Sequence, residues 1–422
     1  MLEMFKSLEK YNYWSREADI SLGYLRDAYL NRIAPYLGNR LIKVIVGQRR
    51  VGKSYLLRQI IYSLLKKKVN PRNIFYLNKE LVDFDDVRNY MDLHKLIIFT
   101  KKRLKIRGKM YIFIDEVQNI SEWEKVVNSL AQDHKDQYEL FITGSNSTML
   151  SGELADKLSG RYISFEMFPF SYAEYIDYYK LNKSKESYLN YLKSGTLPEL
   201  FHLQEEETKR HYVSSLKDTV LLKDIVQRHQ IKDAALLERV FLFLADNIGN
   251  LFSLNSIVSY LNSQGQKTNH ETISNYVLYL EQSYLIHEAS RYDIKGKRIL
   301  AGEKKYYLND LSFRNYLSSS FDFGLGKHLE NAIFIYYKLS GHDVYVGTLS
   351  KAEVDFVVEK GDEKKYIQVV YSLEDPKVLA REFSSLESIR DSYEKMVISL
   401  DDSSFGNKEG VKHVCAWELG GE

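Results

Sequence analysis

The sequence predicts an α/β protein with a five-stranded parallel sheet in a P-loop arrangement, followed by a helical/winged-helix domain and a second α/β domain. First, an apolar strand leads into a glycine-containing loop and then into a helix pattern at residues 43–60. Second, four more apolar segments accompany that strand, as in a parallel sheet between helices, near 73–78, 110–115, 138–143 and 161–166. Third, the region after residue 320 has the order helix, strand, strand, strand, helix, strand.

The length and composition indicate a globular chain of several domains. A chain of 422 residues is long for one hydrophobic core and suggests about three domains. We expect an α/β domain with the glycine-containing loop at residues 1–185, a helical lid or linker at 186–235, a winged-helix domain at 236–315 and a C-terminal α/β domain at 320–422. The formal net charge of +2 implies that any surface for nucleic acid is local.

The cysteine count and the distribution of apolar residues exclude some kinds of site and some locations for this protein. The single cysteine, Cys415, cannot form an internal disulfide and excludes a cysteine-based zinc cluster. No apolar run approaches the roughly 18 residues that a membrane span needs, and the charged first 20 residues lack a signal-peptide core. We therefore expect a cytoplasmic protein with no membrane partner.

The loop at residues 47–54 has the GxxxxGKS pattern in its proper context, between a strand and a helix. Glycines let backbone N–H groups surround an anion, and the helix N-terminus adds its positive end. Lys53 is expected to reach the β and γ phosphates of ATP, and Ser54 to bind Mg²⁺. The alternative is a plain turn before a helix. The predicted cofactor-binding residues are Gly47, Gln48, Arg49, Arg50, Val51, Gly52, Lys53, Ser54 and Tyr55.

Two further strands end in residues that suit ATP hydrolysis. The segment MYIFIDE ends in Asp115 and Glu116, the Walker B pattern. Asp115 would belong to the Mg²⁺ shell and Glu116 would polarise the attacking water. The segment YELFITGSN places Asn146 where a sensor of the γ-phosphate is expected, with Thr143 and Ser145 as rivals. The alternative is turn chemistry, since Gly, Ser and Asn are common in turns.

Arg161 opens the next strand after a loop. A guanidinium at this position could reach a phosphate in its own subunit or in a neighbouring one. If it acts on a neighbour, the active form is a homo-oligomer, and a hexamer would satisfy that requirement. The alternative is a structural arginine.

The middle of the chain has the pattern of a winged helix-turn-helix. Three amphipathic helices are expected between residues 236 and 286, the third with a capping box formed by Thr268 and Glu271. Two β segments follow and form the wing. In a version that binds DNA, the third helix enters the major groove and the wing contacts phosphates. The alternative is a module that docks proteins. The predicted nucleic-acid contacts are Lys295, Lys297, Arg298, Lys304 and Lys305.

Several blocks of the chain together resemble a known family. They are GQRRVGKS, FIDEVQ, ITGSNSTMLSGELADKLSGRY, FPFSYAEY, GTLPEL, LLKDIVQRHQIKD, NYVLYLEQSYLIHEASRYDIKGKR and KYYLNDLSFRN. These blocks are similar to AAA-type ATPases of archaea and bacteria, in the branch with a C-terminal domain of unknown function and a nuclease-like module. The resemblance spans nearly the whole chain and implies ATP and Mg²⁺ as cofactors.

The C-terminal order of elements resembles the PD-(D/E)xK nuclease fold, related to restriction endonucleases. Asp355 and Gln368 match that family's motif, and Glu330 matches its helix glutamate, but Val370 stands where the family has lysine. Glu353 shares a strand face with Asp355. The nearby Lys364 and Lys365 could substitute for the lost lysine. The favoured interpretation is a remnant that folds and binds without cutting, and the alternative is an active nuclease.

These features lead to one main functional hypothesis and two alternatives. The main one is an ATP-hydrolysing, oligomeric motor or switch that acts on DNA; branched or damaged DNA is a suggestion by analogy. The first alternative is a regulatory NTPase whose nucleotide state controls protein docking. The second is a metal-dependent nuclease gated by ATP.

Overall fold

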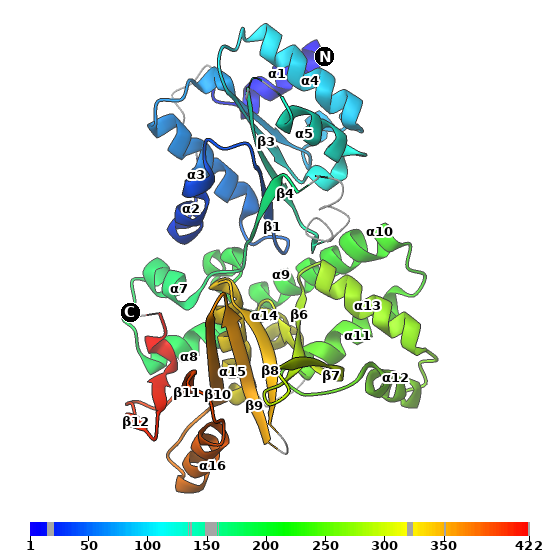
Figure 1. Cartoon of the computed structure of the whole chain (residues 1–422). Helices are drawn as coiled ribbons and strands as arrows, with labels where there is room; N and C mark the ends of the chain where they lie inside the picture. The colour runs from blue at the N-terminus through cyan, green and yellow to red at the C-terminus, as the bar shows by residue number, and fades with distance from the viewer. Residues whose placement is uncertain are drawn as a thin grey trace. The chain divides into compact units, whose positions relative to one another are not determined.

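The computed structural model describes residues 1–14, 21–133, 135, 137–147, 158, 160–318, 324–349 and 352–420 (Figure 1). The chain folds into two compact units, Met1–Met167 and Phe168–Glu422. Each unit is described by itself. Among the described residues, no helix combines the length and the apolar character that crossing a membrane requires.

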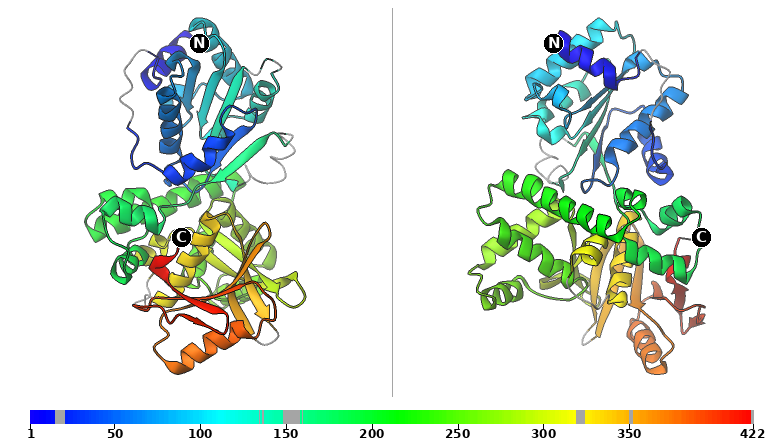
Figure 2. Two further views of the ribbon diagram at one scale, coloured as in Figure 1. Left: turned by 60° about the vertical axis from the view of Figure 1, so that its left-hand side comes forward. Right: turned by 180° about the vertical axis from the view of Figure 1, so that it is seen from behind.

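The first unit contains a five-stranded sheet in which every neighbouring pair is parallel. This confirms the predicted sheet, whose order is β2-β3-β4-β1-β5. All but the last strand are almost completely buried, as expected for a parallel sheet covered on both faces. Figure 2 shows helices on both sides of it. The strands are β1 (Ile42–Val46), β2 (Ile74–Asn78), β3 (Met110–Asp115), β4 (Tyr138–Gly144) and β5 (Tyr162–Glu166).

In the first unit, α3 (Lys53–Lys66), α4 (Tyr90–Arg103) and α5 (Trp123–Ala131) connect successive strands, and the other two helices precede the sheet. In α3, the apolar side chains at helical spacing are buried against the sheet. The side chain of Asn89 caps α4 by accepting hydrogen bonds from the backbone N–H groups of Met91 and Asp92. The α-helices are α1 (Leu2–Tyr11), α2 (Asp27–Ile33), α3 (Lys53–Lys66), α4 (Tyr90–Arg103) and α5 (Trp123–Ala131).

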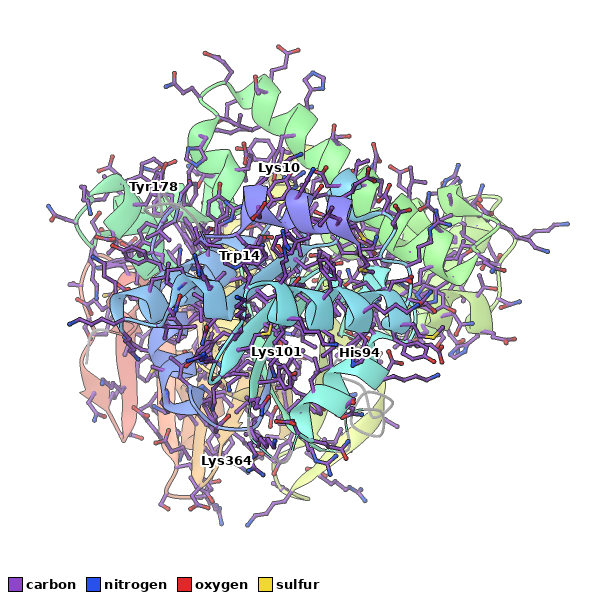
Figure 3. All side chains as sticks on the ribbon, turned by 90° about the horizontal axis from the view of Figure 1, so that it is seen from above. Lys10, Trp14, His94, Lys101, Tyr178 and Lys364 are labelled. Carbon is purple, nitrogen blue, oxygen red and sulfur yellow. The ribbon has the colours of Figure 1, made fainter. Side chains whose placement is uncertain are left out.

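The segment after α1 covers the outer edge of β2. The Asn12 side chain both donates to the carbonyl of Tyr76 and accepts from its N–H, at 2.9 and 2.7 Å. The indole of Trp14 donates to the carbonyl of Ile74 at 2.6 Å (Figure 3). Since an edge strand with free backbone groups invites pairing with other chains, these side chains protect the edge.

The second unit begins with helices and contains one long sheet. Its helices are α7 (Tyr172–Tyr179), α8 (Lys185–Ser194), α9 (Glu206–Thr219), the π-helix η7 (Val220–Val226), α10 (Gln227–His229), α11 (Ala234–Asp246), α12 (Leu254–Ser263), α13 (His270–Gln282), α14 (Ser312–Leu317), α15 (Leu325–Leu339) and α16 (Pro376–Glu387). The three predicted helices of the middle region are present as α11, α12 and α13. The predicted cap of α13 was wrong by one residue: Asn269, not Thr268, accepts the hydrogen bond from the N–H of Thr272.

The sheet of the second unit has eight strands in the order β12-β13-β11-β10-β9-β8-β6-β7. The predicted hairpin is the antiparallel pair β6 and β7, and β6 also pairs in parallel with β8. The hairpin and the C-terminal strands therefore share one sheet, which crosses the boundary expected between residues 315 and 320. The strands are β6 (Ile286–Asp293), β7 (Arg298–Leu308), β8 (Asp343–Leu349), β9 (Ala352–Lys360), β10 (Glu363–Val370), β11 (Glu394–Ser399), β12 (Asn407–Lys408) and β13 (Val411–Cys415).

Two blocks of the sequence, GTLPEL and KYYLNDLSFRN, meet at a buried carboxylate. Asp310 accepts hydrogen bonds of 2.7 Å from both the N–H and the hydroxyl of Thr196, and one of 2.8 Å from the N–H of Ser312. A side chain at Gly195 would collide with Ser312, only 2.5 Å from the position of a Cβ atom. These blocks therefore stabilise the junction between α8 and α14.

Candidate functional sites

The phosphate-binding loop connects β1 to α3 and depends on two glycines. Gly47 has φ +145°, and a Cβ atom there would lie 2.3 Å from the carbonyl oxygen of Met167, so only glycine fits. Gly52 has φ +102° and immediately precedes α3. The buried ammonium of Lys53 donates to the carbonyls of Gly47 and Gln48, at 2.9 and 3.0 Å. The loop thus has the shape and the cation that binding of phosphate requires.

The other predicted loop residues have distinct surroundings. Arg49 forms an ion pair of 2.5 Å with Glu80, and Arg50 adopts φ +69°. Gln48 and Val51 are buried, and the carbonyl of Val51 accepts a hydrogen bond of 3.3 Å from Arg26. Tyr55 is exposed on the first turn of α3. The place of these loop residues beside a nucleotide stays a prediction.

Asp115 ends β3 and lies next to the start of α3. Its carboxylate accepts hydrogen bonds from Thr143 at 2.5 Å and from Tyr76 at 3.1 Å, and it also interacts with the hydroxyl of Ser54. Burial raises the pKa of Asp115, while these hydroxyl groups oppose the shift. The two predicted magnesium ligands, Ser54 and Asp115, are therefore in contact.

This arrangement fits a magnesium ion bound with a nucleotide. Among the described residues, no group of three or more His, Cys, Asp or Glu could hold a metal ion. Mg²⁺ in nucleotide sites is held mostly by phosphate oxygens and water, with one or two protein ligands. Ser54 and Asp115 could supply those ligands, and that role stays a prediction.

Glu116 has a strained backbone and two side-chain partners. Its φ of +55° is unusual for a residue with a side chain, and such strain is often found at functional sites. One carboxylate oxygen lies 3.6 Å from the ammonium of Lys53, and the other accepts a 2.5 Å hydrogen bond from Gln118. Burial opposes its ionisation, but Lys53 and Gln118 together lower the pKa of Glu116. An ionised carboxylate beside the phosphate-binding loop can polarise water.

The three candidate sensors follow one another at the end of β4. The hydroxyl of Thr143 is occupied, since it donates to Asp115 and accepts from the N–H of Glu116 at 2.9 Å. Ser145 lies 3.3 Å from the side-chain nitrogen of Gln118. Asn146 is also buried. The structure therefore gives Thr143 a role in positioning the acids, and Asn146 stays the predicted sensor.

Arg161 lies directly before β5 with its side chain exposed. Its backbone is fixed, because its N–H donates to Leu158 and its carbonyl accepts from Ile42, at 3.0 and 2.9 Å. An exposed guanidinium on a fixed backbone suits a contact with another molecule. A role in catalysis stays a prediction.

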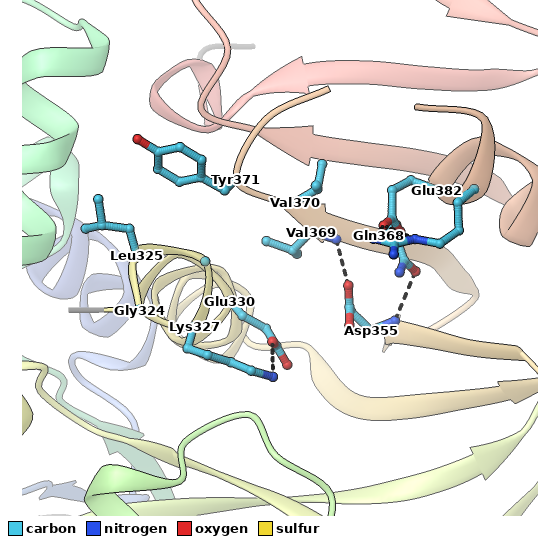
Figure 4. A pocket seen from close by; sticks show the side chains of 12 residues that line it. Gly324, Leu325, Lys327, Glu330, Asp355, Gln368, Val369, Val370, Tyr371 and Glu382 are labelled. Atoms are coloured by element: carbon cyan, nitrogen blue, oxygen red, sulfur yellow. Dashed lines mark hydrogen bonds and ion pairs between the residues drawn. The ribbon is translucent and has the colours of Figure 1, made fainter. Parts of the chain in front are cut away.

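The three residues predicted as a nuclease-like remnant line one cavity of about 640 Å³ in the second unit (Figure 4). Asp355 on β9 accepts a hydrogen bond of 2.9 Å from the N–H of Val369, and its own N–H donates to the side chain of Gln368 at 3.3 Å. Glu330 reaches the same cavity from α15. Burial and the nearby Glu330 raise the pKa of Asp355 to about 7.

The structure corrects the place of Lys305. It was grouped with the wing cations, but it is buried, and its ammonium lies among Glu330, Glu353 and Asp355. An ammonium enclosed by carboxylates is not available to a phosphate. Neither suggested substitute lysine is in this position: Lys364 pairs with Glu359 and Lys365 with Glu394.

The other four predicted wing cations are less buried than Lys305. Lys295, Lys297 and Arg298 are exposed around the turn between β6 and β7. Lys304 is partly buried and paired with Glu288. Nucleic-acid contact by the exposed cations stays a prediction.

Sequence reasoning missed Tyr76 and Gln118 as site residues and assigned Lys305 to the wing instead of the carboxylate cluster. Gln118 follows the Walker B acids by two positions, which was a usable signal. Tyr76 lies on β2 and reaches Asp115 only because β2 is next to β3 in the sheet. For Lys305, the usable signal was the apolar run that follows it in the sequence, which indicates the buried end of a strand.

Two family models and two related proteins match this chain. A model described as "AAA domain" matches residues 39–176, and one described as "Domain of unknown function (DUF8612)" matches residues 185–324. An uncharacterized protein of Haemophilus influenzae is 35% identical over 378 residues, which are 89% of this chain and 92% of that protein. An uncharacterized protein of Methanocaldococcus jannaschii is 29% identical over 384 residues, covering 86% of this chain and 83% of that protein.

Solved structures show weaker similarity. The Aeropyrum pernix ORC1 protein in complex with DNA has a TM-score of 0.36 and 14% identity, covering 72% of this chain and 95% of that one. The Thermotoga maritima RuvB Holliday junction branch migration motor has a TM-score of 0.32 and 15% identity, covering 63% and 89%. The AMPPCP-bound DnaA of Aquifex aeolicus has a TM-score of 0.31 and 17% identity, covering 61% and 87%. These scores are too low to support a functional argument. The identity across the Haemophilus influenzae protein is sufficient, and the chain belongs to the family of that protein, with an AAA domain followed by a domain of unknown function.

Proposed function

We propose that this protein binds ATP with Mg²⁺ in its first unit and hydrolyses the ATP to ADP and phosphate. The observation that carries the proposal is the contact between the phosphate-binding loop and the Walker B acids. Lys53 Nζ lies 3.6 Å from Glu116, and Ser54 interacts with Asp115. These contacts support the proposal, because they join the residues proposed to bind phosphate, to hold Mg²⁺ and to act as the base.

Each residue has a distinct task in this reaction. The backbone N–H groups of residues 47–54 surround the phosphates, and Lys53 exchanges its bonds to Gly47 and Gln48 for phosphate oxygens. Ser54 and Asp115 hold Mg²⁺, which neutralises negative charge on the phosphates when it is bound. Glu116 accepts a hydrogen bond from the attacking water and orients it toward the γ-phosphate.

We propose further that Asn146 senses the γ-phosphate and that Arg161 acts on a nucleotide held by a neighbouring subunit. The support for the second proposal is the exposure of Arg161 at the start of β5. Such a site is complete only in a homo-oligomer, of which a hexamer is one form. A positive charge at the γ-phosphate stabilises the charge that develops during transfer.

We propose DNA as the partner of the second unit, through the hairpin of β6 and β7. The support is the exposure of Lys295, Lys297 and Arg298 within four residues. Each phosphate that such cations neutralise makes binding more sensitive to salt. Branched or damaged DNA is the substrate suggested by analogy.

The experiment is a measurement of ATP turnover with single-stranded, duplex and branched DNA at low salt, together with the native mass in the presence of ATP. We expect DNA to change the turnover and ATP to favour an oligomer. A variant with Lys295, Lys297 and Arg298 replaced by Gln should lose the response to DNA and retain its basal turnover.

The matched control replaces three exposed cations of the first unit, Lys66, Lys67 and Arg103, by Gln. It changes the net charge equally and should keep the response to DNA. Turnover that is indifferent to all three DNA forms would contradict the DNA proposal and would favour a nucleotide-controlled switch for protein docking. A monomer with full turnover would contradict the action of Arg161 on a neighbour.

A further inference from the structure

The ammonium of Lys305 lies at the point where three carboxylates converge. Its nitrogen is 2.8 Å from Glu353, 2.9 Å from Glu330 and 3.5 Å from Asp355. The Lys305 side chain is only 3% exposed. The distances to Glu353 and Glu330 are those of charge-assisted hydrogen bonds, and the distance to Asp355 is that of an ion pair.

Three separate elements supply the participants. Lys305 comes from β7, Glu330 from α15, and Glu353 with Asp355 from one face of β9. Tyr307, two residues along β7, donates a 2.8 Å hydrogen bond to the same oxygen of Glu330 that faces Lys305. The pairing is therefore part of the contact between β7, α15 and β9.

The surroundings of Glu330 are adapted to this arrangement. Gly249 has φ +66°, and a Cβ atom there would lie 3.0 Å from the carboxylate carbon and from both oxygens of Glu330. Lys327 adds a second cation, 3.3 Å from the other oxygen of Glu330, and also donates to the carbonyl of Gly249 at 2.7 Å. The carboxylate thus lies in a close-fitting place with a cation on each side.

A divalent ion bound by these carboxylates would have to occupy the space of the ammonium. Mg²⁺ and Mn²⁺ require several oxygens at about 2.0–2.3 Å from one centre. Here the atom that faces all three carboxylates is Lys305 Nζ, and a dication within a few ångströms of it would be strongly repelled. Lys305 and Lys327 together already offset two of the three negative charges that would otherwise attract a metal.

We infer that Lys305 is the resident cation of this carboxylate cluster, and that the C-terminal cavity holds its ligand without a divalent metal. Without that metal, the module lacks the metal-activated water with which a metal-dependent nuclease cleaves a phosphodiester. The inference deepens the sequence-based interpretation that the C-terminal module is a remnant that binds and does not cut. It gives that property a cause that differs from the loss of lysine at Val370.

The test is a calorimetric titration of Mn²⁺ into the nucleotide-free full chain, using Lys305→Met. All chains carry Asp115→Asn, which removes the carboxylate of the nucleotide site. We expect Lys305→Met to gain one Mn²⁺ per chain, and the further substitution Asp355→Asn to remove that site. The control Lys304→Met alters the neighbouring lysine, which pairs with Glu288, and should gain no Mn²⁺.

If Lys305→Met does not fold, the same titration on the chain with native Lys305 tests the inference. We expect its Mn²⁺ binding to be unchanged by Asp355→Asn, and we expect no cleavage of DNA in Mn²⁺. Mn²⁺ binding or DNA cleavage that disappears with Asp355→Asn would overturn the inference, as would a folded Lys305→Met that gains no site. Because no outcome depends on ATP turnover, failure here and failure of the ATPase proposal are distinguishable.

Discussion

Gln118 holds Glu116 by a hydrogen bond of 2.5 Å, on the carboxylate oxygen opposite to the one that faces Lys53. The same nitrogen of Gln118 lies 3.3 Å from the hydroxyl of Ser145 at the end of β4. Gln118 thereby connects the proposed base with the strand end that carries the proposed sensor. We interpret it as a residue that positions Glu116.

The substitution Gln118→Ala should move the acid limb of ATP turnover to higher pH. The hydrogen bond from Gln118 favours the ionised form and lowers the pKa of Glu116, so its loss raises that pKa. Turnover at low pH should then fall several-fold, with a smaller change near pH 8. The measurement is kcat as a function of pH. Gln137→Ala, at a glutamine bonded to Lys101, is the control; an unmoved acid limb in Gln118→Ala would refute the positioning role.

The substitution Gly249→Ala should destabilise the second unit strongly. It forces a side chain into φ +66°, which costs about 1–2 kcal/mol, and it presses a Cβ atom against Glu330, which adds about 1–3 kcal/mol. Gly265→Ala is the matched control, since Gly265 also has positive φ but no atom within 4 Å of a new Cβ. Gly265→Ala should therefore cost only the about 1–2 kcal/mol that comes from the positive φ.

Urea unfolding followed by the fluorescence of Trp417 measures this difference, in a chain with Trp14 and Trp123 replaced by Phe. Trp417 is then the only tryptophan and reports on the second unit. Equal loss of stability in Gly249→Ala and Gly265→Ala would show that the contact with Glu330 has no cost.

The stability of the second unit should fall between about pH 4.5 and 8 because of Glu281. Burial, and then repulsion by Glu288, raises the pKa of Glu281 to about 8. The folded state therefore binds a proton that the unfolded state releases in this range, and the free energy of unfolding decreases as pH rises. Glu281→Gln should remove the part of this slope that Glu281 contributes, leaving the part that Asp355 contributes below about pH 7, and should stabilise the protein at pH 8 by on the order of 3 kcal/mol.

The measurement is urea unfolding at several pH values, with Glu271→Gln as the control. Glu271 is exposed at the start of the same helix, α13. A slope as steep in Glu281→Gln as in the parent would assign the pH dependence to another group.

Local patterns in the sequence were sufficient for the five parallel strands and for the loop at residues 47–54. Each strand is a short apolar segment, and the loop has fixed spacing between its glycines and Lys53, so neighbouring residues carry the information. The face shared by Glu353 and Asp355 followed in the same way from the period of a strand, and both do contact Lys305.

Relationships between distant segments were not predictable from spacing. Lys305 was assigned to the exposed wing because it follows four other cations, whereas β7 changes from exposed to buried at this residue. Tyr307 shares a strand face with Lys305 and is fully buried, so strict alternation would have suggested a buried lysine. Its carboxylate partners lie 25 to 50 residues away in the sequence. Their contact with Lys305 therefore depends on where the fold places α15 and β9.

The most direct test of the central claim is ATP turnover by Glu116→Gln, measured together with nucleotide binding. The amide keeps the size of Glu116 but cannot accept a proton, so we expect turnover to fall by about 100-fold or more while ATP is still bound. Hydrolysis at the parental rate by Glu116→Gln would contradict the assignment of Glu116 as the base and, with it, the proposed mechanism.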